Sequence, residues 1–493
     1  MRSKTSCFNG TLFRKNLSRY WPLWGLASFV GALFPLAVLL DMVHRGWNVL
    51  SAPDFTGMYY DAVSAVPVIN LVYAALCAMA VWSYLYNARS VGLMHTLPIR
   101  REGLFLTNYL SGLLFLLLPN LAVFLLAGFC IARRALPQAG LSVSIPLGCG
   151  FGVSLLAFVP ACFAVVLGFR LPALLLAAAV VAALAAWLAR HGTPFTRVPD
   201  PDAAALWACV LPLAVVTLYL LHTHVLHLVD GSYHTGQSCY GDMAMHLGFI
   251  KNIAVTGKLP PVYPLLGGEH RFGYPFLCET VSSVFLVLGA DTRTSYLLPM
   301  LAAFISVYGM MWQLARQVLG SAGKACLAFW LFFMGSGFGF VYFLGSAEAF
   351  AGIFTGFYTT PTNYTAENIV WVNPIVDLLI PQRATLFGWC VLFPALYLVW
   401  RFCMEEETRL WRYLALLVLP LPLMHTHSAL ALVLICLACG VYTLVCRPRT
   451  KAVLAPWGWF ALVCGVVWLV EMWNTVFAQS LDGQHMLRLH LNW

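Results

Sequence analysis

The chain has 493 residues, of which 61% are hydrophobic and only 10% are charged, and its mean hydropathy is +0.81. Soluble domains average about 45–50% apolar and about 25% charged residues, so this composition excludes an ordinary soluble protein. The formal charge of +9 does not indicate nucleic-acid binding, because the basic residues form short clusters between apolar runs, as in the cytoplasmic loops of membrane proteins.

Apolar stretches of roughly the 20 residues that cross a bilayer recur along the whole chain. They are residues 21–41, 61–87, 106–131, 144–169, 171–189, 203–226, 296–315, 324–344, 384–402, 411–424, 428–445 and 453–472. The basic, amphipathic segment 8–20, FNGTLFRKNLSRY, predicts a helix along the inner membrane surface. The segment 274–290 is predicted as an interfacial or re-entrant helix. We therefore predict an all-α polytopic membrane protein with about twelve transmembrane helices, a long outer loop and interfacial helices.

The basic clusters also predict orientation, because they favour the cytoplasmic side. They place the N-terminus in the cytoplasm and the chain in the cell membrane. Successive spans must alternate between the two sides of the membrane, and this alternation fails at Arg133 and Arg134. The spans of the second half require these two residues inside, whereas the spans of the first half place the end of the span 106–131 outside. This conflict favours two units, 1–131 and 144–493, with a junction at 132–143. A miscounted re-entrant hairpin is the alternative.

Two segments of the first unit carry a family resemblance: FNGTLFRKNLSRYWPLW at 8–24 and SYLYNARSVGLMHTLPIRREGLFLTNYLSG at 83–112. They resemble permease subunits of bacterial ABC exporters. The resemblance implies a loop facing a separate cytoplasmic ABC ATPase, with contacts from Leu97, Pro98, Arg100 and Arg101. The alternative is a solvated basic loop that only fixes topology. The sequence has no G-x-x-x-x-G-K-[ST] phosphate loop, so any ATP would be hydrolysed by that other subunit.

In the second unit, a span at 203–226 leads into a long outer loop with an early acidic segment, YGDMAMH at 240–246. GYPF at 273–276 and a span ending at Arg316 follow. This pattern resembles polytopic glycosyltransferases of the GT-C class, which move a sugar from a lipid-phosphate donor on the outer membrane face. The resemblance implies a lipid-linked sugar donor and membrane lipids as partners. The chain ends soon after its last span, so we expect a form of this class truncated at the C-terminus.

Asp242 is the candidate general base, because sugar transfer needs a group that accepts the proton of the acceptor hydroxyl. The acidic pair of the class is absent, since His246 follows Asp242 without a neighbouring carboxylate. In a helix the i, i+4 spacing puts both on one face, so the pair acts as base and orienter or binds one divalent cation. The alternative is a helix-capping Asp beside a surface His.

If successive spans alternate between the two sides of the membrane, four segments lie on the outer side: residues 227–295, 345–383, 425–427 and 473–493. Ionisable groups at a membrane are costly and tend to remain where they pair or work, which marks Glu279 and Arg383. Arg383 is the candidate ligand of the donor phosphate, which a guanidinium can hold bidentately. His425 and His427 are candidates for the same role. The alternatives are an Arg that reaches the headgroups and a polar turn.

These patterns favour a membrane glycosyltransferase that uses a lipid-phosphate sugar. The second interpretation is a permease subunit of an ABC exporter without its own ATPase. The third is a membrane protein that keeps the GT-C architecture without catalysis.

Overall fold

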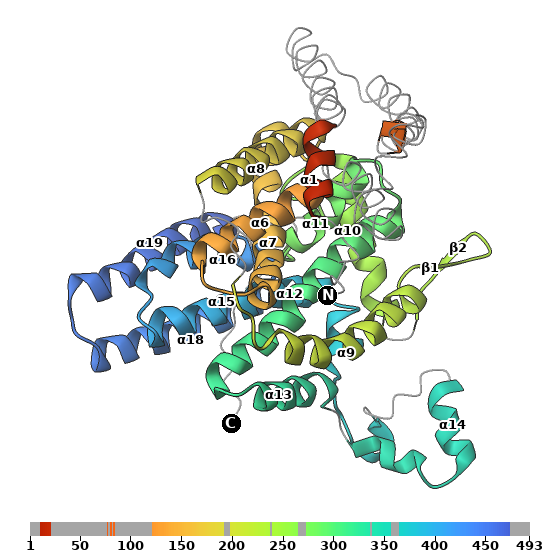
Figure 1. Cartoon of the computed structure of the whole chain (residues 1–493). Helices are drawn as coiled ribbons and strands as arrows, with labels where there is room; N and C mark the ends of the chain where they lie inside the picture. The colour runs from red at the N-terminus through yellow and green to blue at the C-terminus, as the bar shows by residue number, and fades with distance from the viewer. Residues whose placement is uncertain are drawn as a thin grey trace, which may run out of the picture. The chain divides into compact units, whose positions relative to one another are not determined.

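The computed structural model of the chain (Figure 1) describes residues 10–20, 76, 79–80, 82–83, 121–191, 198–236, 239–264, 273–335, 338–355 and 364–473. The predicted ATPase-facing residues Leu97, Pro98, Arg100 and Arg101 lie outside the described residues. So does the predicted span 21–41, together with most of 61–87.

The structure divides into two compact units, Met1–Val123 and Phe124–Trp493. This division lies near the start of helix α6 (Leu121–Ala135), earlier in the chain than the predicted junction at 132–143. The residues of that junction form the end of α6, a short turn and the first residues of α7 (Leu141–Leu167).

In the first unit, helix α1 (Gly10–Arg19) occupies the predicted basic segment. Leu12 and Asn16 are buried, one turn apart on one face, whereas Lys15 and Arg19 are exposed. This distribution is that of an amphipathic helix.

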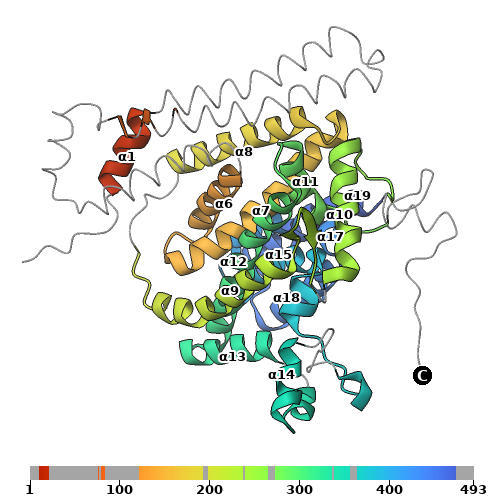
Figure 2. The same cartoon turned by 90° about the vertical axis from the view of Figure 1, so that its right-hand side faces the viewer.

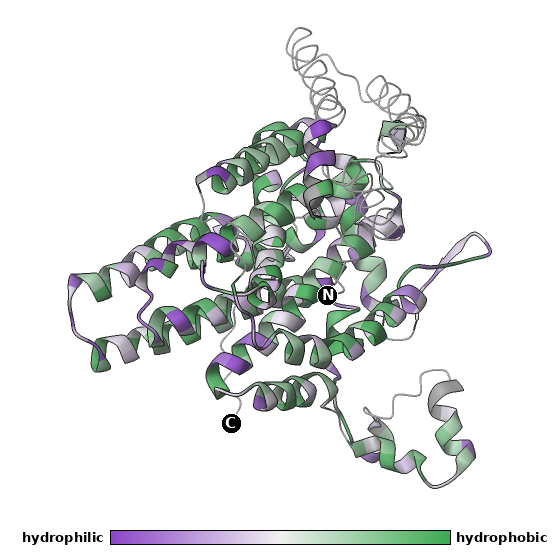
Figure 3. Ribbon diagram, in the orientation of Figure 1, coloured by the Kyte–Doolittle hydropathy of each residue, from purple (hydrophilic) through white to green (hydrophobic). Residues whose placement is uncertain are grey.

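Seven described helices of the second unit are long and apolar enough to cross a membrane. They are α7, α8 (Leu171–His191), α9 (Ala203–His224), α12 (Thr292–Leu319), α15 (Arg383–Met404), α18 (Thr426–Cys446) and α19 (Lys451–Met472). Figure 3 shows that their residues are mostly hydrophobic, with hydrophilic residues mainly at helix ends and turns. The predicted class, a helical membrane protein, therefore agrees with the structure, while the number twelve stays a prediction.

Two predicted spans take a different form. The stretch 324–344 becomes helix α13 (Ala322–Met334) followed by the 3₁₀ helix η3 (Phe338–Phe343). The stretch 411–424 becomes α16 (Trp411–Val418) and α17 (Leu421–Met424). Pro420 and Pro422 lie at this second break, where proline removes backbone donors and ends a helix.

The remaining elements are shorter than these spans. They are the helices α10 (Tyr240–Thr256), α11 (Leu277–Val287) and α14 (Ala347–Thr355), the 3₁₀ helices η4 (Thr365–Glu367) and η6 (Thr408–Leu410), the π-helix η5 (Pro374–Leu379), and the strands β1 (His227–Val229) and β2 (Ser232–His234). The strands form an antiparallel hairpin in which His227 pairs with His234. Its turn is Asp230–Gly231, both with positive φ, as a tight two-residue hairpin requires.

The core of the second unit lies where α12 packs against both α7 and α15. Figures 1 and 2 show these three helices in the middle of the assembly. Buried hydroxyls there donate to backbone carbonyls: Ser306 to Cys390 at 2.9 Å and Ser154 to Leu417 at 2.8 Å. Such small polar residues allow close helix contact while their own hydroxyls are hydrogen-bonded.

Side-chain contacts join the ends of α7, α9, α12, α15 and α18 on one side of the assembly, which we call the basic end. These contacts are Asp200–Ser142, Gln313–Ser142, Arg316–Asp202, Gln317–Glu405 and Arg447–Glu406. Arg133 also lies there, since it donates to the carbonyl of Ala139 at the start of α7. The opposite end, where α9 finishes and α12 and α15 begin, is called the site end. Arg293 donates to the carbonyl of His222 there.

Helix α6 meets α7 through glycines. A Cβ at Gly128 would collide with the backbone of Gly148 and Gly152. We expect Gly128→Ala to lower the free energy of unfolding by about 1–3 kcal/mol, because the two backbones must separate. Gly440→Ala in α18 is the control, since a Cβ at that position meets nothing within 4 Å. Thermal unfolding in detergent compares the variants, and equal melting temperatures would contradict this packing.

Candidate functional site

At the site end, three ionisable side chains from three helices meet in the interior. His246 of α10 donates from Nδ1 to Oε1 of Glu279 in α11 at 2.5 Å. Arg383, the first residue of α15, faces the other oxygen of that carboxylate, with 3.5 Å between Nε and Oε2. All three residues are 0% exposed. We call this group the buried triad.

Arg383 also makes close contacts with other parts of the site end. Its Nη1 donates to the carbonyl of Tyr296 in α12 at 3.0 Å, and its Nη2 donates to the hydroxyl of Ser282 in α11. The guanidinium carbon lies 4.1 Å from the ring centroid of Tyr296 and 5.0 Å from that of Phe387. Arg383 therefore ties α11, α12 and α15 together, and its donors point inward.

The burial of helix α11 explains why these groups lie in the interior. Helix α11 was predicted as interfacial or re-entrant, yet ten of its eleven residues are buried, and it packs against α7, α10, α12 and α15. A carboxylate on such a helix needs a buried cation and hydrogen-bond donors. Arg383 supplies the charge, so the triad has no net charge when the imidazole is neutral. Removing one member of such a buried pair strongly destabilises a protein.

Not every polar atom of the site has a hydrogen bond. Nε2 of His246 and the hydroxyl of Tyr296 are buried without a partner among the described residues. Because an ionised carboxylate only accepts hydrogen bonds, Nδ1 of His246 must be the donor to Glu279. In the neutral ring Nε2 then carries the lone pair. Tyr274 packs edge-on against this ring, with 6.1 Å between the centroids.

Asp242 lies one turn before His246, in the first turn of α10, and is half-buried. The first turn of a helix favours a negative charge because its backbone N–H groups are free. Burial raises the pKa of the Tyr274 phenol, and the charges of Glu279 and Asp242 raise it further. Tyr274 therefore remains protonated beside His246 of the buried triad.

His425 and His427 precede and open α18, and their ring centroids are 5.4 Å apart. His425 is half-buried against Gly388 of α15, and its Nδ1 lies 2.7 Å from the hydroxyl of Ser428. His427 is exposed. Burial and, to a smaller extent, the neighbouring His427 lower the pKa of His425 to about 4. At neutral pH, His425 is an uncharged hydrogen-bonding group.

This depressed pKa predicts a loss of stability in mild acid. The unfolded chain binds a proton at His425 near pH 6.5 and the folded chain only near pH 4, so stability falls as the pH drops through that window. The slope is at most about 1.4 kcal/mol per pH unit. We expect the melting temperature of the wild type to fall more between pH 7 and pH 5 than that of His425→Asn. Equal falls would mean that His425 is solvated in the folded protein.

The structure thus brings some predicted site residues together and separates others. His246 pairs with Glu279, and Glu279 pairs with Arg383. Asp242 is half-buried in the first turn of α10 and has no ion pair with the triad among the described contacts, and Arg383 offers no exposed donor to a phosphate. Ser282, Tyr274 and Tyr296 were not singled out from the sequence. The sequence feature that indicated such partners is Glu279, because a lone acid in an apolar segment needs polar groups beside it.

The structure describes no group of three or more His, Cys, Asp or Glu side chains suited to a metal ion among the residues it covers, so a divalent cation at Asp242 and His246 stays a prediction. Nδ1 of His246 is bound to Glu279, and its Nε2 is the ring nitrogen left without a partner. A single half-exposed carboxylate is a poor cation site by itself, since these ions take six or more oxygen ligands.

Comparison of the chain with known protein families, with curated proteins and with solved structures finds no match.

Proposed function

We propose that the chain is a membrane transferase that moves a sugar from a lipid-phosphate donor to an acceptor hydroxyl, with Asp242 as the general base. The position of Asp242 carries this proposal. It follows the candidate span α9 and the hairpin along the chain, which supports a position near the headgroup region, the level of a lipid phosphate. The GT-C resemblance of the 240–246 and 273–276 segments supports the same assignment.

In the proposed reaction, the acceptor oxygen bonds to the anomeric carbon while the bond from that carbon to the phosphate oxygen breaks. The acceptor proton passes to the carboxylate of Asp242, and the lipid phosphate leaves with the electron pair. Asp242 suits this role because it is partly open to solvent, whereas Glu279 is enclosed. A general base must reach the proton that it removes.

The buried triad has a positioning role in this proposal. It fixes the second turn of α10 through His246, and this turn holds the first turn with Asp242. Of the three residues predicted to bind the donor phosphate, only His427 is exposed in the structure. We therefore propose His427 as the phosphate contact, His425 as its neutral neighbour, and Arg383 as a residue that positions Glu279.

We further propose that the basic end faces the cytoplasm and the site end faces the outside of a cell membrane, with a cytoplasmic N-terminus. Arg316, Lys324, Arg401, Arg447 and Lys451 lie at the termini of spans or short helices on the basic end. Loops rich in arginine and lysine favour the cytoplasmic side. The permease interpretation depends on residues 97–101, outside the described part of the chain, and no structural observation favours it.

The test is donor consumption by purified protein in lipid nanodiscs. Radiolabelled polyprenyl-phosphate hexoses and pentoses are supplied one at a time with membrane extract as the acceptor source, and release of free polyprenyl phosphate is measured. We expect one donor to be consumed by the wild type. If the folded wild type consumes no member of the panel, the transferase proposal fails.

A further inference from the structure

Between α13 and α15 the chain leaves the packed helices and returns. We call residues 338–355 and 364–372 the aromatic arm. Figures 1 and 2 both show α14, its middle part, outside the helical assembly. Many large apolar side chains of the arm are exposed, among them Phe338, Val341, Tyr342, Leu344, Val370 and Trp371. An exposed apolar surface of this extent marks a contact with a partner or a membrane.

The arm has a defined shape. At its base, the indole Nε1 of Trp371 donates to the carbonyl of Gly335 at 3.1 Å. Asn373 donates to the carbonyl of Phe333 at 3.2 Å, so the returning chain is fixed to the end of α13. Further out, Tyr364 packs against Tyr342 with 5.4 Å between the ring centroids. The outgoing and returning parts therefore hold each other, and their apolar residues still face outward.

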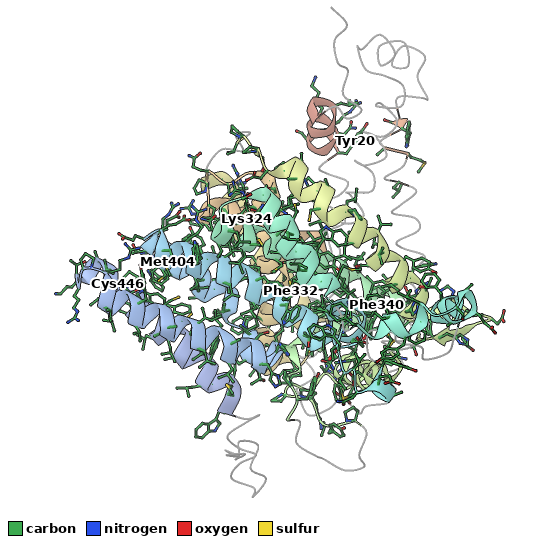
Figure 4. All side chains as sticks on the ribbon, turned by 90° about the horizontal axis from the view of Figure 1, so that it is seen from below. Tyr20, Lys324, Phe332, Phe340, Met404 and Cys446 are labelled. Carbon is green, nitrogen blue, oxygen red and sulfur yellow. The ribbon has the colours of Figure 1, made fainter. Side chains whose placement is uncertain are left out.

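The length of α13 places the base of the arm within the thickness of a bilayer. The helix starts at the basic end, beside Lys324, and its 13 residues rise about 20 Å. The hydrocarbon core of a bilayer is about 30 Å thick, so α13 ends about 10 Å short of the far boundary. Figure 4 labels Lys324, Phe332 and Phe340 in succession along α13 and into η3. The six residues of η3 have a length of about 12 Å, which is similar to this remaining distance.

The charge pattern is consistent with this depth. Residues 325–382 contain no lysine, arginine or histidine, and their acidic residues are Glu348, Glu367 and Asp377. Tyrosine and tryptophan are enriched where hydrocarbon meets headgroups, because their rings are apolar and their N–H or O–H groups are polar. The exposed Glu348 and Glu367 can reach water from that level.

We infer that the aromatic arm lies in the membrane leaflet at the site end, with its apolar side chains, Trp371 among them, against phospholipid acyl chains. The arm is then a lipid-binding anchor. Of residues 345–383, which are predicted on the outer side, only the polar groups then reach the water outside the membrane. This inference does not depend on the transferase proposal.

Hydroxyl-radical footprinting tests the inference on the unmodified protein. The protein is reconstituted in nanodiscs of phosphatidylcholine that hold one chain each, and oxidation is mapped by mass spectrometry. Tyr233 in the polar hairpin is the matched reference, since it is 45% exposed, compared with 53% for Tyr342 and 47% for Trp371. We expect Tyr342 to be oxidised several-fold more slowly than Tyr233. We also expect Trp371 to be oxidised several-fold more slowly than a solvent-exposed tryptophan.

A second measurement identifies the occupant. A phosphatidylcholine with a photoreactive acyl chain should cross-link to peptides of the arm and not to the hairpin. Oxidation of Tyr342 as fast as that of Tyr233 would overturn the inference, because the arm would then be in water. Protection that occurs only in vesicles crowded with protein, and not in nanodiscs with one chain, would overturn it in favour of a second copy of the chain.

Discussion

Replacing Glu279 with glutamine is expected to lower the free energy of unfolding by about 3–5 kcal/mol. The substitution keeps the shape of the side chain but removes its charge. Arg383, which is 0% exposed, then remains as a buried cation without a counter-ion. Thermal or chemical unfolding in detergent micelles measures the effect.

Two further variants make this result specific. Glu348→Gln is the same substitution at an exposed position of α14, and we expect it to change stability little. The double variant Glu279→Gln with Arg383→Gln removes both charges and should cost less than the sum of the two single changes. If Glu279→Gln unfolds at the temperature of Glu348→Gln, the ion pair does not stabilise the folded protein.

Asp242→Asn is expected to reduce the turnover of the lipid-phosphate sugar by about 10²–10⁴-fold, the usual contribution of a general base. The amide preserves the size of the side chain and cannot accept the acceptor proton. Donor binding should persist, because Asp242 is not proposed to contact the phosphate. Initial rates with the donor identified in the nanodisc assay, over a range of donor concentrations, give the turnover and KM separately.

Asp230→Asn is the matched control for this change. Asp230 is exposed in the hairpin turn at a φ of 47°, a conformation that asparagine also tolerates. The substitution Asp230→Asn should leave turnover and stability unchanged. If Asp242→Asn retains turnover within about threefold of the wild type, another group is the base.

The two substitutions also separate catalysis from positioning. Asp242→Asn should reduce turnover without lowering the melting temperature, since its side chain is half-exposed and makes no part of the buried triad. Glu279→Gln should reduce both, because His246 and the second turn of α10 lose their anchor. The opposite pattern, a fully active but unstable Glu279→Gln protein, would assign the triad to folding alone.

The sequence by itself determined the class of this protein and the positions of most of its described spans. The predicted runs 203–226, 384–402 and 453–472 agree within a few residues with α9, α15 and α19. Bilayer thickness explains this success, because it requires about 20 apolar residues in a row wherever the chain crosses. The isolated charges of Glu279 and Arg383 were also visible as groups that needed partners.

Tertiary structure alone decided which partners those were. Helix α10 has apolar residues on several faces, so its pattern did not show that His246 turns inward to Glu279 while Asp242 stays at the edge. Likewise, Arg383 at the start of α15 could have reached the headgroups, and only the packing of α11 and α12 around it directs the guanidinium inward. Hydropathy reports the average surroundings of a segment, whereas the direction of one charged side chain depends on which helices pack beside it.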